Sequence, residues 1–313
     1  MSSFRVVVTD PLVPDVDVER QIIGAAGGEL EVASGDRAAV IDAARHGDAL
    51  LNTYFPLGAD VLGQLGRCRI VARYGIGIDN VDLAAANRMG IAVTNVPDYC
   101  VEEVATHALA LALGLVRRIK AADGLVAAGS WGADKLGAVR RFSTLTVGLV
   151  GYGKIARRLG ELIAPFGCPV LVSDPYVTSA GAGQRLVSLP ELLATADIVS
   201  LHCPLTGETR GMVNAATIAS MRDGAILINV ARGGLVVTAD VLAALGSGKL
   251  SGAGLDTFDT EPPVAAELSA APNLIATPHS GYYSVEAVNE SKRKAATQIA
   301  KLFRGESLDY RVN

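Results

Sequence analysis

The sequence predicts an α/β protein made of two doubly wound parallel sheets, with the second unit inserted into the first. Short apolar runs alternate with helical patterns over most of the 313 residues, and this alternation is typical of a parallel sheet covered by helices. The runs fall into two series separated by a long helical stretch. The length also suits two domains of roughly 150 residues each.

The first series predicts an open sheet near the amino terminus. Its expected strands are Arg5–Thr9, Glu29–Val32, Ala49–Asn52, Ile70–Arg73 and Ala92–Thr94. A helical stretch over about Val101–Ala128 follows, and its broad apolar face predicts a helix buried between the two units. The sequence Gly129-Ser-Trp-Gly132 ends this stretch.

The second series predicts a second sheet. Its expected strands are Thr146–Val150, Pro169–Ser173, Ile198–His202, Ala225–Asn229, Gly252–Leu255 and Leu274–Ala276. An amphipathic helix over about Val285–Phe303 then closes the chain, and its position suggests that it crosses back to the first unit. The predicted domains are therefore residues 1–100 with 284–313, and residues 101–283.

The composition narrows the class of protein. Half of the residues are hydrophobic and 19% are charged, which suits a well-buried globular enzyme. The net charge of -4, without a basic cluster, does not indicate nucleic-acid or anionic-membrane binding. No apolar run approaches the roughly 18 residues of a membrane span, and the amino terminus does not resemble a signal peptide.

The cysteines and histidines add two further expectations. The cysteines are scattered and form no CxxC motif, which predicts reduced thiols in a cytoplasmic protein; they are Cys68, Cys100, Cys168 and Cys203. The four histidines lack metal-ligand spacing, so we expect no metal site. His107 lies on the long predicted helix, and its role stays open.

A glycine-rich turn joins a predicted strand to a predicted helix at Gly151-Tyr-Gly-Lys-Ile-Ala156. Gly151 permits a tight turn, Gly153 lets the backbone approach a pyrophosphate, and Ala156 allows close packing of helix on strand. The helix that begins at Lys154 and Ile155 offers free N–H groups and the positive end of its dipole to phosphates. By itself this pattern is also compatible with an ordinary turn of small residues.

An acid at the end of the next strand strengthens the interpretation. Asp174 lies close to the spacing of about 20 residues that a dinucleotide-binding Rossmann unit requires. A carboxylate there accepts hydrogen bonds from a ribose diol and repels a 2′-phosphate, which favours NAD over NADP. The alternative is a strand-end turn residue before Pro175.

Several further motifs, which follow one another in the order found in one protein family, extend the interpretation to the whole chain. They are Arg73–Asp82, Val93–Pro97, Leu201–Thr206, Met221–Gly234, Gly254–Phe258 with Glu261-Pro262, and Thr277–Gly281. Through them the sequence resembles the D-isomer-specific 2-hydroxyacid dehydrogenase family. Thr277–Ser284 is similar to the branch that contains the C-terminal binding proteins, beside phosphoglycerate dehydrogenase-like members. The resemblance implies a Rossmann NAD-binding domain inserted into a flavodoxin-like substrate domain.

The resemblance also implies a catalytic set that suits the chemistry. A 2-oxo acid is an anion, and its reduction requires a fixed cation and a proton donor beside the carbonyl. Arg232 would bind the substrate carboxylate and polarise the carbonyl oxygen. His279 would exchange the proton, and Glu261 would orient its ring and favour its charged form. Each residue also has a purely structural alternative. Arg232 would cap a strand, His279 would be a hydrogen-bonded core histidine, and Glu261 would be a solvated loop acid.

The resemblance implies further contacts for the two ligands. The amides of Ile76 and Gly77 would meet the substrate carboxylate across the cleft from Arg232, although an ordinary glycine turn is the alternative. Tyr54 and Tyr282 would line the substrate pocket, which favours a small, apolar or aromatic 2-oxo acid over a phosphorylated one. The remaining cofactor contacts would come from Cys203, Pro204, Thr209, Val230, Ala231, Asp256 and Gly281.

The expected function is reversible, NAD-dependent interconversion of a D-2-hydroxy acid and a 2-oxo acid. The chief alternative is an NAD(H)-responsive binding or assembly protein of the C-terminal binding protein type. A related dehydrogenase that acts on an unusual anion such as phosphite is a third possibility. The family further implies a homodimer, whose interface the Val101–Ala128 region would help to form.

Overall fold

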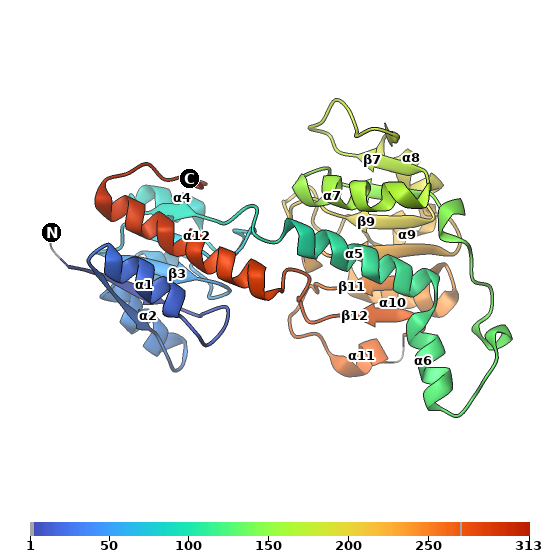
Figure 1. Ribbon diagram of the computed structural model, residues 1–313, viewed down its shortest axis with the longest axis horizontal. Helices are drawn as coiled ribbons and strands as arrows, with labels where there is room; N and C mark the ends of the chain where they lie inside the picture. The colour runs from blue at the N-terminus through green and yellow to red at the C-terminus, as the bar shows by residue number, and fades with distance from the viewer. Residues whose placement is uncertain (1–2, 270) are drawn as a thin grey trace. The chain divides into compact units, whose positions relative to one another are not determined.

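The computed structural model describes residues 3–269 and 271–313. The chain forms two compact units, Met1–Tyr99 with Ser284–Asn313, and Cys100–Tyr283. Each unit contains one sheet, and the paired strands of both sheets run parallel (Figure 1). The predicted pair of parallel-sheet α/β units is therefore confirmed.

The first unit has a five-stranded sheet in the order β2-β1-β3-β4-β5. This is the flavodoxin-like order, in which the direction of winding reverses between β1 and β3. The strands lie close to their predicted positions: β1 (Phe4–Val8), β2 (Gly28–Val32), β3 (Ala49–Asn52), β4 (Ile70–Arg73) and β5 (Ala92–Thr94).

Helices cover both faces of the first sheet. On one face, α1 (Asp17–Ala25) lies beside α12 (Val285–Arg304), which also contacts β3 and β4 (Figure 1). The other face buries Val7, Leu50 and Val71 against the remaining helices, which are α2 (Arg37–Arg45), α3 (Ala59–Leu62) and α4 (Leu83–Arg88). Burial on both faces explains why these strands are apolar runs without alternation.

The second unit has a seven-stranded sheet in the order β12-β11-β10-β9-β6-β7-β8. The six strands from β6 to β11 follow the Rossmann order, and β12 adds a seventh strand at one edge. The strands are β6 (Val147–Val150), β7 (Val170–Ser173), β8 (Gln184–Leu186), β9 (Ile198–Leu201), β10 (Ala225–Asn229), β11 (Leu250–Leu255) and β12 (Leu274–Ala276). The sequence prediction missed β8, a three-residue edge strand that pairs with β7 and contains two polar residues.

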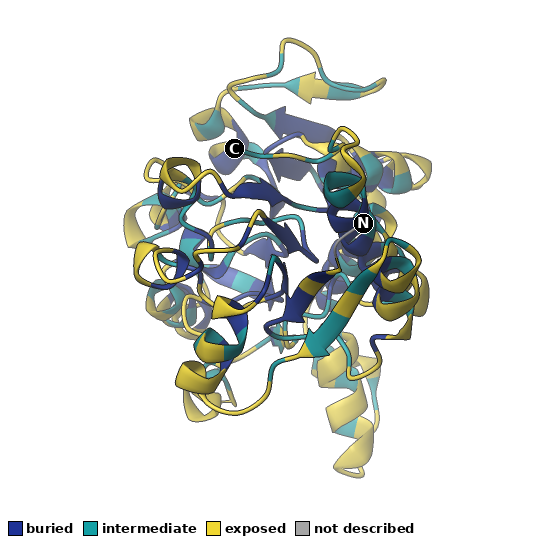
Figure 2. Cartoon of the chain, turned by 90° about the vertical axis from the view of Figure 1, so that its left-hand side faces the viewer, coloured by how far each residue is buried: buried dark blue, intermediate teal, exposed yellow. Residues whose placement is uncertain are grey.

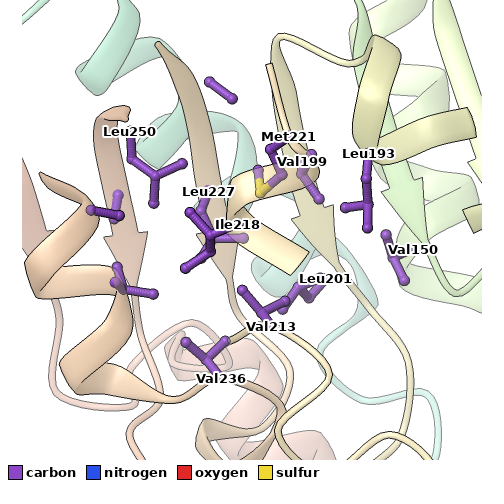
Figure 3. Packing of buried hydrophobic residues seen from close by; sticks show 14 of the residues in the cluster. Val150, Leu193, Val199, Leu201, Val213, Ile218, Met221, Leu227, Val236 and Leu250 are labelled. Atoms are coloured by element: carbon purple, nitrogen blue, oxygen red, sulfur yellow. The ribbon is translucent and has the colours of Figure 1, made fainter. Parts of the chain in front are cut away.

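Two layers of helices enclose the second sheet. On one face α5 (Val101–Val116) packs against α7 (Lys154–Ile163) and against β10 to β12. On the other face Leu227 and Val199 pack with Ile218 in one apolar cluster (Figure 3). This face is covered by α8 (Leu189–Thr195), α9 (Ala215–Ser220) and α10 (Thr238–Ser247), while α11 (Ala265–Ser269) lies in the segment before β12. Figure 2 shows the strands mostly as buried and the outer faces of the helices as exposed.

The predicted continuous helix over Val101–Ala128 is wrong in one respect. The chain turns at Arg118, whose φ of 53° is left-handed, and α5 is followed by a separate helix, α6 (Ile119–Ala127). None of the residues of α6 is buried, whereas α5 buries seven residues. The helix α5 is therefore buried against its own sheet and α6 is not buried, while burial between the two units stays a prediction. No helix in the described part of the chain is long and apolar enough to span a membrane.

Candidate active site

The turn after β6 lies where the winding of the second sheet reverses. Gly151 has a φ of 85°, a conformation that favours glycine. A Cβ atom on Gly151 would lie 2.6 Å from the backbone nitrogen of Cys203, on the loop after β9. The glycine therefore allows the loops that follow two neighbouring strands to touch, as the sequence predicts for a tight turn.

The start of α7 presents an unobstructed helix amino terminus. Gly153 occupies the N-cap position. Among the described residues, no side chain caps the helix, and a Cβ atom on Gly153 would meet no other atom within 4 Å. Lys154 and Ile155 form the first turn, and Ala156 is fully buried against the sheet. Free N–H groups at the positive end of a helix dipole suit a pyrophosphate, so these residues fit a dinucleotide.

Asp174, just after β7, reaches back to the same turn. One of its carboxylate oxygens accepts the N–H of Tyr152 at 2.7 Å, and the other accepts the N–H of Tyr176 at 2.8 Å. Each carboxylate oxygen offers more than one acceptor site, so the group retains acceptor capacity for a ribose diol. The structure thus brings together the glycine turn and the acid that the sequence spacing paired.

The loop after β9 is stabilised by its own polar groups. The hydroxyl of Thr209 donates to the carbonyl oxygen of Pro204 at 2.7 Å, and it accepts the N–H of Thr206 at 2.8 Å. Burial lowers the pKa of His202 to about 4 and raises the pKa of the Cys203 thiol to about 11. Near neutral pH both side chains are uncharged, so they serve the shape of the loop rather than acid–base chemistry.

Arg232 lies on the loop after β10 and is positioned by its neighbours. The side-chain amide of Asn229 donates to the carbonyl oxygen of Arg232 at 2.9 Å, while its oxygen accepts the N–H of Ala231 at 3.1 Å. The side chain of Arg232 donates to the carbonyl oxygen of Ala231 at 2.8 Å. Val230, in the same loop, is buried.

Gly233 joins this loop to the segment that carries Glu261. A Cβ atom on Gly233 would lie 1.8 Å from the carbonyl carbon of Phe258, so only glycine fits this contact. The N–H of Phe258 in turn donates to one oxygen of Glu261 at 3.0 Å. The backbone of Phe258 therefore links the position of Arg232 to that of Glu261.

Glu261 and His279 form a hydrogen-bonded pair. Nδ1 of His279 lies 2.9 Å from the second carboxylate oxygen of Glu261. Burial acts to raise the pKa of the Glu261 carboxyl, but the hydrogen bonds from His279 and Phe258 outweigh it and lower this pKa. The pairing agrees with the arrangement that the family resemblance implies.

Asp256 anchors the loop that carries His279. Its buried carboxylate accepts the hydroxyl of Thr277 at 2.6 Å and the N–H groups of Ser280 and Gly281 at 2.9 Å each. Burial acts to raise the pKa of this carboxyl, yet the surrounding hydrogen bonds, led by that from His107, hold it below its ordinary value. A Cβ atom on Gly281 would lie 2.8 Å from Asp256, which explains the glycine by packing.

His107, whose role the sequence leaves open, belongs to this network. Its Nε2 lies 3.0 Å from the hydroxyl oxygen of Thr277 and 3.5 Å from Asp256. Because Thr277 donates its only hydroxyl proton to Asp256, Nε2 of His107 must carry a proton, and this N–H faces both the Thr277 hydroxyl oxygen and the Asp256 carboxylate. No sequence pattern indicates this contact, since 170 positions separate His107 from Thr277.

Tyr282 also lies near His279 within the second unit. The centroids of the two rings are 6.3 Å apart, and the planes are nearly perpendicular, at 73°. The ring of Tyr282 is thus close enough to contact a molecule that approaches the imidazole. The neighbouring Tyr283 is 59% exposed.

The remaining predicted substrate residues belong to the first unit. Tyr54 follows β3 and is 49% exposed. Ile76 and Gly77 follow β4, where the side-chain amide of Asn95 donates to the carbonyl oxygen of Ile76 at 2.8 Å. A Cβ atom on Gly75 would lie 2.1 Å from the guanidinium of Arg73, so the side chain of Arg73 passes over this glycine.

A family model matches the second unit. Residues 109–281 match the "D-isomer specific 2-hydroxyacid dehydrogenase, NAD binding domain". The chain belongs to the D-isomer-specific 2-hydroxyacid dehydrogenase family. The second unit is accordingly an NAD-binding domain, and NAD is the cofactor that its glycine turn and Asp174 fit.

Known proteins of this family resemble the chain over its whole length. It is 33% identical to a hydroxypyruvate reductase of Thermotoga maritima, with 97% of this chain and 99% of that protein covered. The D-lactate dehydrogenase of Aquifex aeolicus, solved with NAD and lactic acid, superposes with a TM-score of 0.87 at 29% identity over 96% of each chain.

A longer relative is also similar. The D-3-phosphoglycerate dehydrogenase of Mycobacterium tuberculosis is 37% identical over 100% of this chain but only 59% of its own length. The chain therefore spans about three fifths of this relative. Among the residues that the structure describes, no cluster of His, Cys, Asp or Glu is arranged to hold a metal ion.

Proposed function

We propose that the protein is an NAD-dependent oxidoreductase that interconverts a D-2-hydroxy acid and a 2-oxo acid. The observation that carries the proposal is the His279–Glu261 hydrogen bond of 2.9 Å, in the same domain as the NAD-type glycine turn. A histidine held by a carboxylate is suited to general acid–base catalysis near neutral pH. In this proposal the second unit is the NAD-binding domain and the first unit is the substrate domain.

The proposed mechanism assigns one task to each side chain. The guanidinium of Arg232 binds the substrate carboxylate and polarises the carbonyl oxygen. When bound, NADH supplies the hydride that forms the new C–H bond at C2. The electron pair of the C=O π bond moves to oxygen, and His279 donates its Nε2 proton to that oxygen, because Nδ1 already pairs with Glu261. Oxidation runs through the same steps in reverse.

Supporting residues keep this arrangement in place. Asn229 and Gly233 fix the loop that carries Arg232, and Phe258 fixes Glu261. Asp256 holds the loop on both sides of His279 through Thr277, Ser280 and Gly281. We propose that Ile76, Gly77, Tyr54 and Tyr282 contact the substrate. The other predicted cofactor contacts are Cys203, Pro204, Thr209, Val230 and Ala231.

Assays of a panel of 2-oxo acids with NADH test the proposed activity. The absorbance of the reduced nicotinamide measures the turnover of each 2-oxo acid. His279→Gln should lower kcat by about 10²–10⁴-fold, the usual contribution of a general acid–base group. The affinity for NADH should change by less than about twofold, because the glycine turn and Asp174 are untouched. Tight NADH binding by the parent without turnover of any 2-oxo acid would contradict the proposal and favour an NAD(H)-responsive binding protein.

We also propose that the chain forms a homodimer through the α6 region. In this region Ile119 is 58%, Val126 57% and Trp131 83% exposed, although all three side chains are large and apolar. A short segment that exposes several large apolar side chains is a candidate for a protein interface. Trp131→Glu should shift the protein from dimer to monomer in sedimentation-velocity experiments, whereas Tyr176→Glu, at another exposed aromatic residue, should not. A monomeric parent would contradict the proposal.

A further inference from the structure

The connection between β7 and β8 carries Asp174 and contains no helix. Parallel strands are usually joined by a crossover that includes a helix. Here residues 174–183, all of which the structure describes, form an irregular loop instead (Figure 1). More than half of these residues are exposed, and Tyr176 is 87% exposed. Contacts with the rest of the domain, rather than helical hydrogen bonds, must therefore hold this segment, which we call the β7–β8 loop.

Tyr152, between the first two glycines of the cofactor turn, is bonded to both ends of the β7–β8 loop. At the start of the loop, the backbone N–H of Tyr152 donates to Asp174 at 2.7 Å. At its end, the phenol oxygen accepts the N–H of Gly181 at 2.9 Å. The same hydroxyl donates to the side-chain oxygen of Gln184, the first residue of β8, at 2.6 Å. A phenol hydroxyl can donate and accept at once, so these bonds are compatible.

The surroundings of the phenol keep it in this position. The side chain of Tyr152 is buried, and the guanidinium carbon of Arg157 lies 4.3 Å from the centre of its ring. Nε of Arg157 also donates to the carbonyl oxygen of Tyr152 at 3.1 Å. Gly181 leaves room for the phenol oxygen, and Gly160 in α7 leaves room for the side-chain amide of Gln184. The turn after β6, α7 and the start of β8 therefore meet at one side chain.

The β7–β8 loop begins at the acid that fits the ribose of the adenosine half of NAD. In a Rossmann domain this acid follows the second strand and binds the ribose hydroxyls. An exposed segment with few internal hydrogen bonds opens readily unless other contacts hold it. A loop that is already held in its binding conformation loses less freedom when the ligand binds, so the affinity is higher. Bonds to both ends of the loop can therefore strengthen cofactor binding without touching the cofactor.

We propose that the phenol hydroxyl of Tyr152, with its partner Gln184, is a positioning group for the adenosine half of NAD. It holds the β7–β8 loop in the arrangement in which Asp174 accepts the ribose. The inference concerns how the domain binds NAD, so it goes beyond the proposed reaction and its test requires no turnover. It also gives the short edge strand β8 a function, because Gln184 is the first residue of this strand.

Tyr152→Phe tests the proposal, because it keeps the ring beside Arg157 and removes both bonds of the hydroxyl. Gly181 and Gln184 are only partly buried, so water can solvate the groups left behind and the variant should fold. In fluorescence titrations the Kd of NADH should rise about 5- to 30-fold, the effect of one or two hydrogen bonds on the population of the held loop. In calorimetric titrations ADP-ribose, which contains the adenosine half, should lose affinity by the same factor.

A ligand without adenosine separates positioning from a general disturbance of the domain. Reduced nicotinamide mononucleotide should bind Tyr152→Phe and the parent with affinities within about twofold, because it does not reach the β7–β8 loop. The matched control is Tyr176→Phe, which removes the hydroxyl of an exposed tyrosine in the same loop and should change each affinity by less than about twofold.

A second variant keeps the test decisive if Tyr152→Phe does not fold. Gln184→Met removes the acceptor and should raise the Kd of ADP-ribose by a smaller factor, because the phenol still accepts from Gly181. Thermal unfolding checks that each variant is folded. Unchanged affinity for ADP-ribose in the folded variants, or an equal loss for reduced nicotinamide mononucleotide, overturns the inference while the proposed reaction stands. A parent that binds NADH but reduces no 2-oxo acid contradicts the proposed reaction and leaves this inference in place.

Discussion

Replacing Glu261 by Gln tests the hydrogen-bond geometry on which the proposed proton transfer depends. One carboxylate oxygen accepts the N–H of Phe258 at 3.0 Å, and the other lies 2.9 Å from Nδ1 of His279. A glutamine has the same shape, but it offers one acceptor oxygen and one donor NH₂ group. It cannot accept from both neighbours at once, so one of the two contacts must fail.

Each orientation of the new amide has a defined consequence. If the oxygen of the new amide keeps the hydrogen bond from the N–H of Phe258, the amide NH₂ group faces Nδ1 of His279. Nδ1 must then accept this hydrogen bond, so the neutral imidazole carries its proton on Nε2. That tautomer cannot take a proton at Nε2, and it is a poor acid. If the amide reverses, the N–H of Phe258 loses its acceptor, which costs about 1–3 kcal/mol, or roughly 5- to 150-fold in population.

We therefore expect Glu261→Gln to lower kcat by at least about fivefold in both directions, and by as much as about 10⁴-fold if the wrong tautomer dominates. Steady-state assays of reduction and oxidation measure the effect, and fluorescence titration should show NADH affinity within about twofold of the parent. Glu267→Gln, at an exposed position on α11, is the matched control and should behave like the parent. A Glu261→Gln enzyme with kcat within twofold of the parent in both directions would refute the reasoning.

Three further predictions concern the elements around this pair. Asp174→Ala should reduce the preference for NADH over NADPH in calorimetric titrations, and an unchanged ratio would count against its ribose role. Gly233→Ala should destabilise the protein by about 1–3 kcal/mol in urea unfolding and lower kcat, because the new Cβ overlaps Phe258, whereas Gly246→Ala, with open space, should not destabilise it. Asp256 has a lowered pKa when folded, so it stabilises the fold above the ordinary carboxyl pKa of about 3.9, and this stabilisation is lost as the pH falls through the folded value. Asp256→Asn should accordingly have a lower free energy of unfolding than the parent at neutral pH and a similar one in acid. An equal loss of stability at both pH values would contradict the stabilising role of the Asp256 carboxylate.

The elements that the sequence predicts well are those with strong local signals. The buried strands are continuous apolar runs, because helices cover both faces of each sheet, and their predicted limits agree with the structure within one or two residues. The glycine turn and Asp174 are recognisable because the phosphate and ribose contacts of one nucleotide require a fixed spacing along the chain. The motifs and their order were sufficient to predict the family, and the match of the family model over residues 109–281 confirms this prediction.

The elements that the sequence did not predict depend on neighbours far along the chain. The strand β8 has a weak apolar pattern and is stabilised by its pairing with β7. The break between α5 and α6 contains neither glycine nor proline, since the left-handed residue is Arg118. The apolar pattern continues on both sides of Arg117 and Arg118, and it cannot show that only the part in α5 is buried.

The amino-acid sequence by itself determined the two α/β units, the NAD fingerprint and the identity of Arg232, Glu261 and His279 as candidates. Only the tertiary structure decided how these side chains are supported. Phe258 links Gly233 to Glu261, His107 and Asp256 hold the loop of His279, and the carboxylate of Asp10 after β1 accepts the N–H of Thr53 after β3. Local patterns report which residues repeat along one helix or strand, whereas these contacts arise when parallel strands place the loops at their carboxyl ends side by side.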